Sequence, residues 1–316
     1  IVDTHTAKAG FSARFAVLVY NFLFRQHVHI VHTFHGHVFD GYFSRTKSTF
    51  FVWIERMIAK LTNVIIAISD TQRQELVEKY RIAPKEKVRT IELGFDLSPF
   101  LLCNDAKGRF RKKLSIDADT ITVGIIGRLV PIKNHTMFLR TARLFLDTNP
   151  DIKIKFIIVG DGECRQELEK TCMAMRLSEQ VIFWGWVRNI QEVYADLDIL
   201  ALTSLNEGTP FSIIEAMASS VPVIATLAGG VQDLLGYSNL PIPDKGFAVC
   251  HRGILCQKND STGFASGLKY LISEPEAIQQ KRIQAAREFV SIRYSQKRLL
   301  QDIETLYLEL MGQQQG

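Results

Sequence analysis

The sequence predicts an α/β protein of two domains, each with a parallel sheet covered by helices on both faces. The chain has 316 residues, and at roughly 150 residues per domain two domains are expected. Short β-branched runs alternate with amphipathic segments, and the runs are apolar throughout, as in strands buried on both faces. Hydrophobic residues make up 47% of the chain and charged residues 22%, which excludes a disordered or collagen-like protein.

The apolar runs are expected to form strands, and the amphipathic stretches between them are expected to form helices. The predicted strands are 28–34, 63–68, 88–93, 121–126, 154–159, 181–183, 199–202 and 221–225. The predicted helices are 44–60, 71–80, 135–147, 163–175 and 210–219. The opening residues also resemble the middle of a strand, while 277–311 has no strand signal and predicts two helices.

The composition changes between residues 97 and 119, and we place the domain boundary there. A Ser-Pro step is followed by the run 107–113, in which five of the seven residues are Lys or Arg. The expected domains are 1–100 and 117–286. A C-terminal helix, 287–312, is expected to cross back to the first domain.

The charge is uneven along the chain. Residues 1–116 hold 18 Lys and Arg against 10 Asp and Glu, a net charge of +8, and the remaining 20 and 23 give −3. This asymmetry is typical of a part that meets nucleic acid, a membrane surface or a phosphorylated ligand, although an ordinary solvated surface explains it equally simply.

The cysteines and the apolar stretches limit the class of protein further. Five scattered cysteines favour a reducing compartment, with Cys250 and Cys256 as free thiols. No uninterrupted apolar run approaches eighteen residues, so no membrane-spanning helix is predicted. The aromatic stretch 50–54, with Met57 and Ile58, is expected to be a core-facing helix surface rather than a membrane anchor.

The stretch 206–218 carries the most chemical information. Thr209 suits a helix N-cap and Pro210 the first helical position. Gly208 lets the backbone approach a ligand, and the amides at a helix start form an anion site. A phosphate could therefore dock there while Glu207 or Glu215 accepts hydrogen bonds from sugar hydroxyls. The alternative is a capped surface helix with two solvated glutamates, and the spacing alone does not decide between them.

A second stretch, 123–135, places two cations just after a predicted strand. The strand ends at Gly127, and Arg128 and Lys133 follow in the loop. Loops after strand C-termini are where open α/β sheets bind ligands. Two fixed cations there would stabilise the charge that builds up on a leaving diphosphate. A plain polar turn is the alternative for either residue alone.

Taken together, these stretches resemble the retaining glycosyltransferases of the GT-B fold, family 4, and bacterial members in particular. The matching motifs of the second half are 127–133 (Gly-Arg-Leu-Val-Pro-Ile-Lys), 159–163 (Val-Gly-Asp-Gly-Glu), 183–186 (Phe-Trp-Gly-Trp) and Glu207 with Glu215. Those of the first half are 4–10 (Thr-His-Thr-Ala-Lys-Ala-Gly), 32–37 (His-Thr-Phe-His-Gly-His), 66–69 (Ile-Ala-Ile-Ser) and 93–96 (Leu-Gly-Phe-Asp). The likeness covers essentially the whole chain.

The resemblance implies two Rossmann-like domains with a cleft between them and a nucleotide-diphosphate sugar bound to the second. By position, Arg128 and Lys133 would contact its phosphates, with Gly127 packed closely against them. Glu207 would contact the donor sugar, and Glu215 would hold the ribose hydroxyls. The rest of the donor site would be lined by Gly208, Thr209, Pro210, Phe211 and Ile214, and the nucleobase would lie against Trp186 and Val187.

In the first domain, the resemblance places His35 in the cleft near the transferred sugar. Six of the eight histidines fall within the first 37 residues, which would suit a metal cluster. However, they have no strong zinc spacing with a Cys or carboxylate partner. We therefore expect neither a metal nor a cofactor, and regard His37 and Asp40 as acceptor-side contacts.

The expected activity is transfer of a sugar from a nucleotide donor to an acceptor hydroxyl with retention of configuration, in polysaccharide, lipopolysaccharide or glycolipid synthesis. UDP is favoured over GDP, and the acceptor is a saccharide or a lipid-linked molecule. The location is cytoplasmic or peripheral on an anionic membrane, and no nucleic acid is involved. The first residues match a point inside the first domain, so about 80–100 residues appear absent. A nucleotide-sugar-binding fragment without transfer activity and a sugar-nucleotide epimerase remain alternatives.

Overall fold

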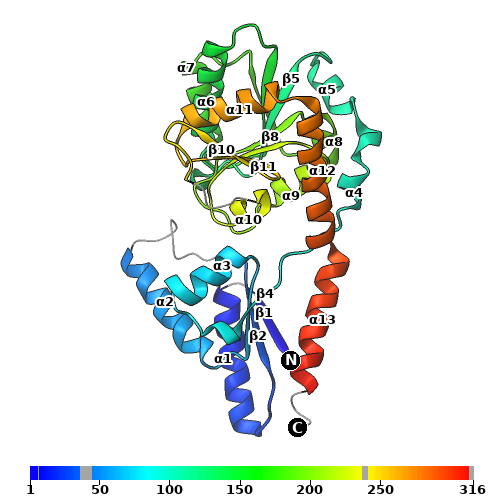
Figure 1. Cartoon of the computed structure of the whole chain (residues 1–316). Helices are drawn as coiled ribbons and strands as arrows, with labels where there is room; N and C mark the ends of the chain where they lie inside the picture. The colour runs from blue at the N-terminus through cyan, green and yellow to red at the C-terminus, as the bar shows by residue number, and fades with distance from the viewer. Residues whose placement is uncertain (6, 36–44, 237–240, 313–316) are drawn as a thin grey trace. The chain divides into compact units, whose positions relative to one another are not determined.

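The computed structural model describes residues 1–5, 7–35, 45–236 and 241–312, and it divides into two compact units (Figure 1). The first unit comprises Ile1–Phe95 together with Arg293–Gly316, and the second comprises Asp96–Ile292. The stretch 101–116, which the sequence left unassigned, thus lies in the second unit.

The described part of the first unit contains a four-stranded parallel sheet in the order β1-β2-β3-β4. Its strands are β1 (Val2–His5), β2 (Ile30–Phe34), β3 (Val64–Ala67) and β4 (Val88–Thr90). Its helices are α1 (Ala7–Phe24), α2 (Arg45–Ala59), α3 (Asp70–Gln74) and α13 (Gln296–Gly312). The predicted helix 71–80 is split, because the turn Glu75–Lys79 that continues α3 is a π-helix.

Alternate residues of β3 enter two different clusters, so this sheet is covered on both faces as predicted. Ile65 and Ala67 pack with Phe34 and Leu76 on one face. Val64 and Ile66 pack with Leu306 and Leu310 of α13 on the other. The C-terminal helix α13 therefore completes the core of the first unit.

The expectation for the aromatic stretch of α2 is only half right. Phe51 and Val52 pack on the core, but Phe50 and Trp53 are each 58% exposed and Met57 is 47% exposed. The apolar run is longer than one helical face, so every third or fourth residue turns outward.

The described residues of the second unit form a seven-stranded sheet in the order β10-β11-β9-β8-β5-β6-β7. The strands are β5 (Ile121–Ile126), β6 (Ile154–Val159), β7 (Val181–Gly185), β8 (Ile199–Leu202), β9 (Val223–Thr226), β10 (Phe247–Cys250) and β11 (Gly253–Cys256). All neighbours are parallel except β10 and β11, an antiparallel pair that the sequence did not predict.

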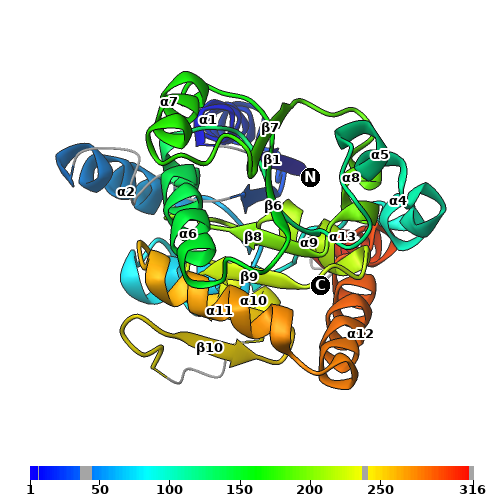
Figure 2. The same ribbon diagram turned by 90° about the horizontal axis from the view of Figure 1, so that it is seen from above.

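The helices of the second unit cover this sheet. They are α4 (Ser98–Leu101), α5 (Arg109–Leu114), α6 (His135–Thr148), α7 (Arg165–Ala174), α8 (Ile190–Asp196), α9 (Phe211–Ala218), α10 (Val231–Leu235), α11 (Ser261–Ser273) and α12 (Glu276–Arg293). Figure 2 shows α6 and α11 side by side along the sheet. Between α6 and β6, Phe138 and Phe145 meet Phe156 edge to face.

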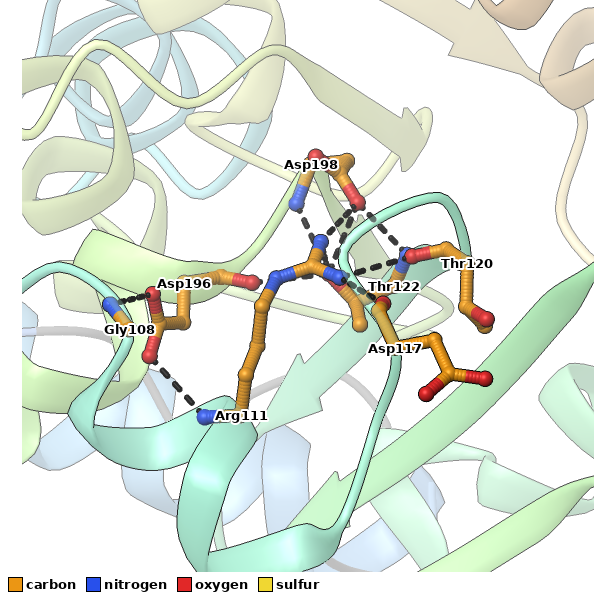
Figure 3. Close-up of polar contacts among 7 residues, drawn as sticks. All are labelled: Gly108, Arg111, Asp117, Thr120, Thr122, Asp196 and Asp198. Atoms are coloured by element: carbon orange, nitrogen blue, oxygen red, sulfur yellow. Dashed lines mark hydrogen bonds and ion pairs between the residues drawn. The ribbon is translucent and has the colours of Figure 1, made fainter.

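The carboxylates of Asp196 and Asp198 bind part of the basic run 107–113 (Figure 3). Asp196, which is 3% exposed, accepts hydrogen bonds from the backbone N–H groups of Gly108, Phe110 and Arg111 at 2.5, 2.7 and 2.9 Å. The Arg111 guanidinium donates to Asp198 at 2.6 Å. The segment that precedes β5 is therefore held by the ends of α8 and β8, and Arg111 is not part of a free basic surface.

Candidate functional site

The predicted donor residues follow neighbouring strands of the second unit. Gly127 and Arg128 come directly after β5, and Glu207 lies in the loop after β8, which pairs with β5 in parallel. Strand β5 lies between β8 and β6, so the chain crosses to opposite sides of it. This is a topological switch point, the place where open α/β sheets bind ligands.

The loops after β5 and β6 approach each other backbone to backbone. Gly160 has φ +134°, and a Cβ there would lie 2.0 Å from the carbonyl oxygen of Gly127. A Cβ at Gly162 would lie 2.5 Å from the carbonyl oxygen of Leu129. The Gly-Asp-Gly motif is thus required by close packing, which keeps the start of the 127–133 loop in place.

Lys133 and Glu207 form an ion pair across the ends of β5 and β8. The Lys133 Nζ lies 2.6 Å from Glu207 Oε1, and Ser204 Oγ donates to the same oxygen at 2.6 Å. Both charged side chains are mostly shielded, with 22% and 11% exposed. Arg128 is exposed, and no hydrogen bond or ion pair of its side chain occurs within the described ranges. The structure therefore brings Lys133 and Glu207 together and leaves the Arg128 charge available to a ligand.

Hydroxyl groups that the sequence analysis did not single out hold this pair of loops. Thr203 Oγ1 lies 3.1 Å from the carbonyl oxygen of Lys133 and 3.0 Å from that of Asn134. Thr226 Oγ1 donates to the carbonyl oxygen of Ser204 at 2.6 Å. Thr203, Ser204 and Thr226 are all fully buried. Small hydroxyl residues at the ends of buried strands were the available signal for them.

The start of α9 differs from the prediction. The helix begins at Phe211, Pro210 occupies the N-cap position, and no side chain caps the helix. Thr209 Oγ1 is buried and has no hydrogen-bond partner among the described residues. Thr209 therefore does not cap α9, because it precedes the N-cap by one residue and its hydroxyl misses the first free amides. Gly208 is half-buried and Phe211 is 52% exposed, whereas Ile214 is fully buried.

Glu215 on α9 is held by Tyr194 of α8. Tyr194 Oη donates to Glu215 Oε2 at 2.8 Å, and the Tyr194 side chain is almost completely buried. Burial raises the pKa of the Glu215 carboxyl, and the hydrogen bond from Tyr194 partly opposes that rise. Sequence reasoning missed Tyr194, because nothing in its local pattern points to residue 215.

Trp186 and Val187 follow the end of β7. The Trp186 side chain is 80% exposed and Val187 is half-buried. Strand β7 is the edge strand opposite β10, and β6 lies between β7 and β5. The structure places them at the same sheet edge as Arg128, since β5, β6 and β7 are parallel.

A cavity of about 490 Å³ in the second unit involves none of the predicted donor residues. It is lined by Lys107, Tyr194, the segment 219–221 that follows α9, and Arg287 of α12, among others. It thus lies at the C-terminal end of α9, whereas the predicted residues lie at and before the N-terminal end. Gly127, Arg128 and Glu207 lie instead in the loops that follow the C-terminal ends of β5 and β8.

In the first unit, His35 follows β2 and contacts His5 at the end of β1. His5 Nδ1 lies 2.8 Å from His35 Nε2. His32 is buried on β2, and burial together with Arg14 lowers its pKa to about 3. His37 and Asp40, the expected acceptor-side contacts, lie outside the described residues. Within the described ranges, no three His, Cys, Asp or Glu side chains are grouped so that they could hold a metal ion.

The fold and the site define a class: an α/β protein with two parallel-sheet units, one of which has a charged site at its switch point. Family models match both units. "Glycosyltransferase Family 4" matches residues 1–99 and "Glycosyl transferases group 1" matches residues 120–274. The chain therefore belongs to the family 4 (group 1) glycosyltransferases of the GT-B fold, as the resemblance implied.

Individual relatives agree with this family. The UDP-Gal:alpha-D-GlcNAc-diphosphoundecaprenol alpha-1,3-galactosyltransferase of Escherichia coli is 28% identical over 232 residues, which cover 73% of this chain and 58% of that protein. The D-inositol 3-phosphate glycosyltransferase of Corynebacterium jeikeium is 29% identical over 233 residues, covering 70% and 52%. The chain thus spans about half the length of the curated relatives that it matches.

Solved structures share the fold. Anabaena Alr3699/HepE in complex with UDP superposes with a TM-score of 0.80 at 22% identity, covering 96% of this chain and 78% of that chain. A Rickettsia africae glycosyltransferase gives 0.77 at 20% identity, covering 98% and 76%. None of the helices in the described parts of this chain combines the length and apolar character needed to cross a bilayer.

Proposed function

We propose that the protein transfers a hexosyl group from a nucleotide-diphosphate sugar to an acceptor hydroxyl, with retention of the anomeric configuration. The observation that carries this proposal is the Lys133–Glu207 pair, 2.6 Å apart at the adjoining ends of β5 and β8. It brings a cation and a carboxylate to a switch point in the unit that the group 1 family model matches.

The proposed chemistry uses charge stabilisation and positioning. Arg128, Lys133 and the free amides at the start of α9 would stabilise the leaving diphosphate. Glu207 would orient the donor sugar, and Glu215 would accept hydrogen bonds from the ribose diol. The leaving phosphate oxygen would take the acceptor proton in a front-side displacement, so neither carboxylate acts as the base. With two cations for the diphosphate, the proposal includes no metal requirement.

The proposed donor is a UDP-sugar, with a GDP-sugar as the second choice. The Escherichia coli relative is named for UDP-Gal, and the structures of Anabaena Alr3699/HepE contain UDP or UDP-glucose. Glu215 would bind the ribose of either nucleotide, so discrimination would come from the segment around Trp186 and Val187.

The proposed acceptor is a lipid-linked saccharide in envelope polysaccharide or glycolipid synthesis, used in the cytoplasm at an anionic membrane surface. The Escherichia coli relative is named for a diphosphoundecaprenol acceptor. Phe15, Phe22, Phe50 and Trp53 of α1 and α2 are between 58% and 85% exposed. Together with the net charge of +5 on residues 1–95, which hold 13 Lys and Arg against 8 Asp and Glu, these aromatic side chains suit an interfacial contact.

Membrane contact is tested by sedimentation with vesicles of phosphatidylcholine containing increasing phosphatidylglycerol. Binding should rise with the anionic fraction and fall in a Phe22→Ser, Trp53→Ser variant. Met173→Ser is the control, since Met173 is 61% exposed on α7 of the other unit. Binding that does not change with the phosphatidylglycerol content would exclude the proposed contact with an anionic membrane.

The transferase proposal is tested by incubating the protein with UDP- and GDP-sugars, with and without a lipid-linked acceptor, and reading the product anomer by NMR. Glu207→Gln should lower turnover roughly 100-fold or more while nucleotide affinity changes little. Glu167→Gln, at an exposed glutamate of α7 outside the motifs, should retain activity. Intact turnover of Glu207→Gln, or an inverted product, would contradict the assignment.

A further inference from the structure

A chain of polar contacts in the first unit runs from the C-terminal helix to His35. Tyr307 Oη of α13 donates to Asp3 Oδ2 of β1 at 2.8 Å. Asp3 Oδ1 lies 3.8 Å from His5 Nε2, and His5 Nδ1 lies 2.8 Å from His35 Nε2. The two imidazole rings have centroids 5.0 Å apart. Residues 3, 5, 35 and 307 thus form one array.

The charges around the array favour one arrangement of protons on the two histidines. The His5–His35 hydrogen bond needs one N–H and one lone pair. Asp3 Oδ1 lies too far from His5 Nε2 for a hydrogen bond, but its charge favours a proton on that nitrogen, which leaves His5 Nδ1 as the acceptor. His35 Nε2–H must then be the donor, and a neutral His35 presents a lone pair at Nδ1. The second ring nitrogen of a histidine is commonly set in this way by what the first one bonds.

We propose that His5 is a positioning residue for His35, and that Asp3 and Tyr307 act through it to keep the Nδ1 lone pair of His35 free to accept a hydrogen bond from a sugar hydroxyl. This inference rests on the proposed transferase function for the identity of the hydroxyl. His5 itself need not touch the substrate.

The charged surroundings are consistent with a neutral His35. Partial burial and the neighbouring His5 lower the pKa of His35, and Asp3 opposes this. Other titratable groups on the same elements include His32 of β2, Arg14 of α1, Glu55 of α2 and Tyr307 of α13. His32 Nδ1 bonds Thr4 Oγ1 at 2.8 Å rather than a member of the array, although His5 and His35 help to lower its pKa. The Arg14 charge is met by Glu55 at 2.8 Å.

The array is tested without any substrate by ¹⁵N NMR of the histidine side chains in the whole protein. At pH 7.5, His35 should carry its proton on Nε2. His5→Phe keeps a ring but removes the acceptor, so the His35 tautomers should mix and the His35 pKa should rise. Asp3→Asn should lower the His35 pKa, because a raising influence is lost. His251→Gln, at an exposed position of the other unit, should leave His35 unchanged.

Kinetics give an independent readout. His5→Phe should lower kcat about tenfold with little change in the donor KM, and Tyr307→Phe should lower it about threefold. The acidic limb of the pH profile should move up in His5→Phe and down in Asp3→Asn. Loss of packing alone would not move the limb in opposite directions, and thermal denaturation identifies any variant that fails to fold.

The outcomes separate this inference from the proposed function. A proton on Nδ1 of His35, or a His35 titration that is the same in all variants, would overturn the inference even in an active enzyme. The expected tautomer and opposite pKa shifts in a protein without transferase activity would support the array and overturn the transferase assignment.

Discussion

The two units position their polar groups in different ways. In the second unit, Lys133 and Glu207 follow adjoining parallel strands, so the sheet topology alone brings them together. In the first unit, the parallel pairing of β1 with β2 brings His5 and His35 together in the same way, and only the contact of Tyr307 with Asp3 requires α13 to return to β1. The pair in the second unit thus needs only two neighbouring strands, whereas the array around His35 also includes one contact that spans 304 positions of the chain. Substitutions in each unit test this difference.

The largest effect is expected where backbone approaches backbone in the second unit. A Cβ at Gly229 would lie 1.9 Å from the carbonyl oxygen of Glu207, and φ there is +54°. Gly229→Ala should therefore cost roughly 4–5 kcal/mol of unfolding free energy. Gly108→Ala has a φ of +84° but open space, and should cost about 1–2 kcal/mol. Urea denaturation measures both, and equal losses would show that the Glu207 loop is not held by this contact.

The next largest loss of unfolding free energy is expected when a buried ion pair is broken in either unit. Arg14 meets Glu55 between α1 and α2, and Arg282 of α12 meets Glu274, with side chains at most 7% exposed in both pairs. Arg14→Met and Arg282→Met should each cost about 3 kcal/mol, because a buried carboxylate loses its partner.

Adding Glu55→Leu or Glu274→Leu should recover most of that loss. Denaturation of the single and double variants tests the point. A double variant as unstable as its parent single variant would mean that packing, rather than the lone charge, causes the loss.

Each unit also contains a buried neutral histidine. Burial lowers the pKa of His32 to about 3 and that of His135 to about 4. The unfolded chain therefore takes up protons first, so stability is full above pH 6.5 and falls as the pH drops. Between pH 6.5 and 5 each histidine should remove about 2 kcal/mol. Denaturation at both pH values should show this fall, and His135→Phe should reduce it by about half. A slope unchanged by His135→Phe would contradict the prediction.

The smallest effect concerns the Tyr194–Glu215 hydrogen bond. Tyr194→Phe should cost about 1 kcal/mol and raise the Glu215 pKa further, because the bond that lowers it is lost. UDP affinity, measured by calorimetry, should fall about fivefold at neutral pH and more steeply below it, as Glu215 becomes protonated. If the UDP affinity of the variant did not depend on pH, Glu215 would not contribute to nucleotide binding.

The sequence predicted the positions of strands, because these depend on patterns of residues that lie close together in the chain. The apolar runs located β5, β6 and β8 to the residue. The start of α9 was wrong by one residue, because Thr209 and Pro210 each suit two adjacent positions. Tyr194 and the partners of His35 could not be predicted, since their contacts join separate elements. The exposure of Phe50 and Trp53 was not predicted either, because an apolar run does not show which of its residues the neighbouring elements cover.

The proposed function requires that the loop at Arg128, which follows the C-terminal end of β5, binds a nucleotide diphosphate. The direct measurement is the shift in melting temperature with millimolar UDP for the wild type, Arg128→Ala and Arg140→Ala, in which Arg140 is exposed on α6. A ligand bound to the folded state raises the melting temperature, so UDP should stabilise the wild type and Arg140→Ala but stabilise Arg128→Ala much less. No shift in the wild type, or equal shifts in all three proteins, would contradict the account.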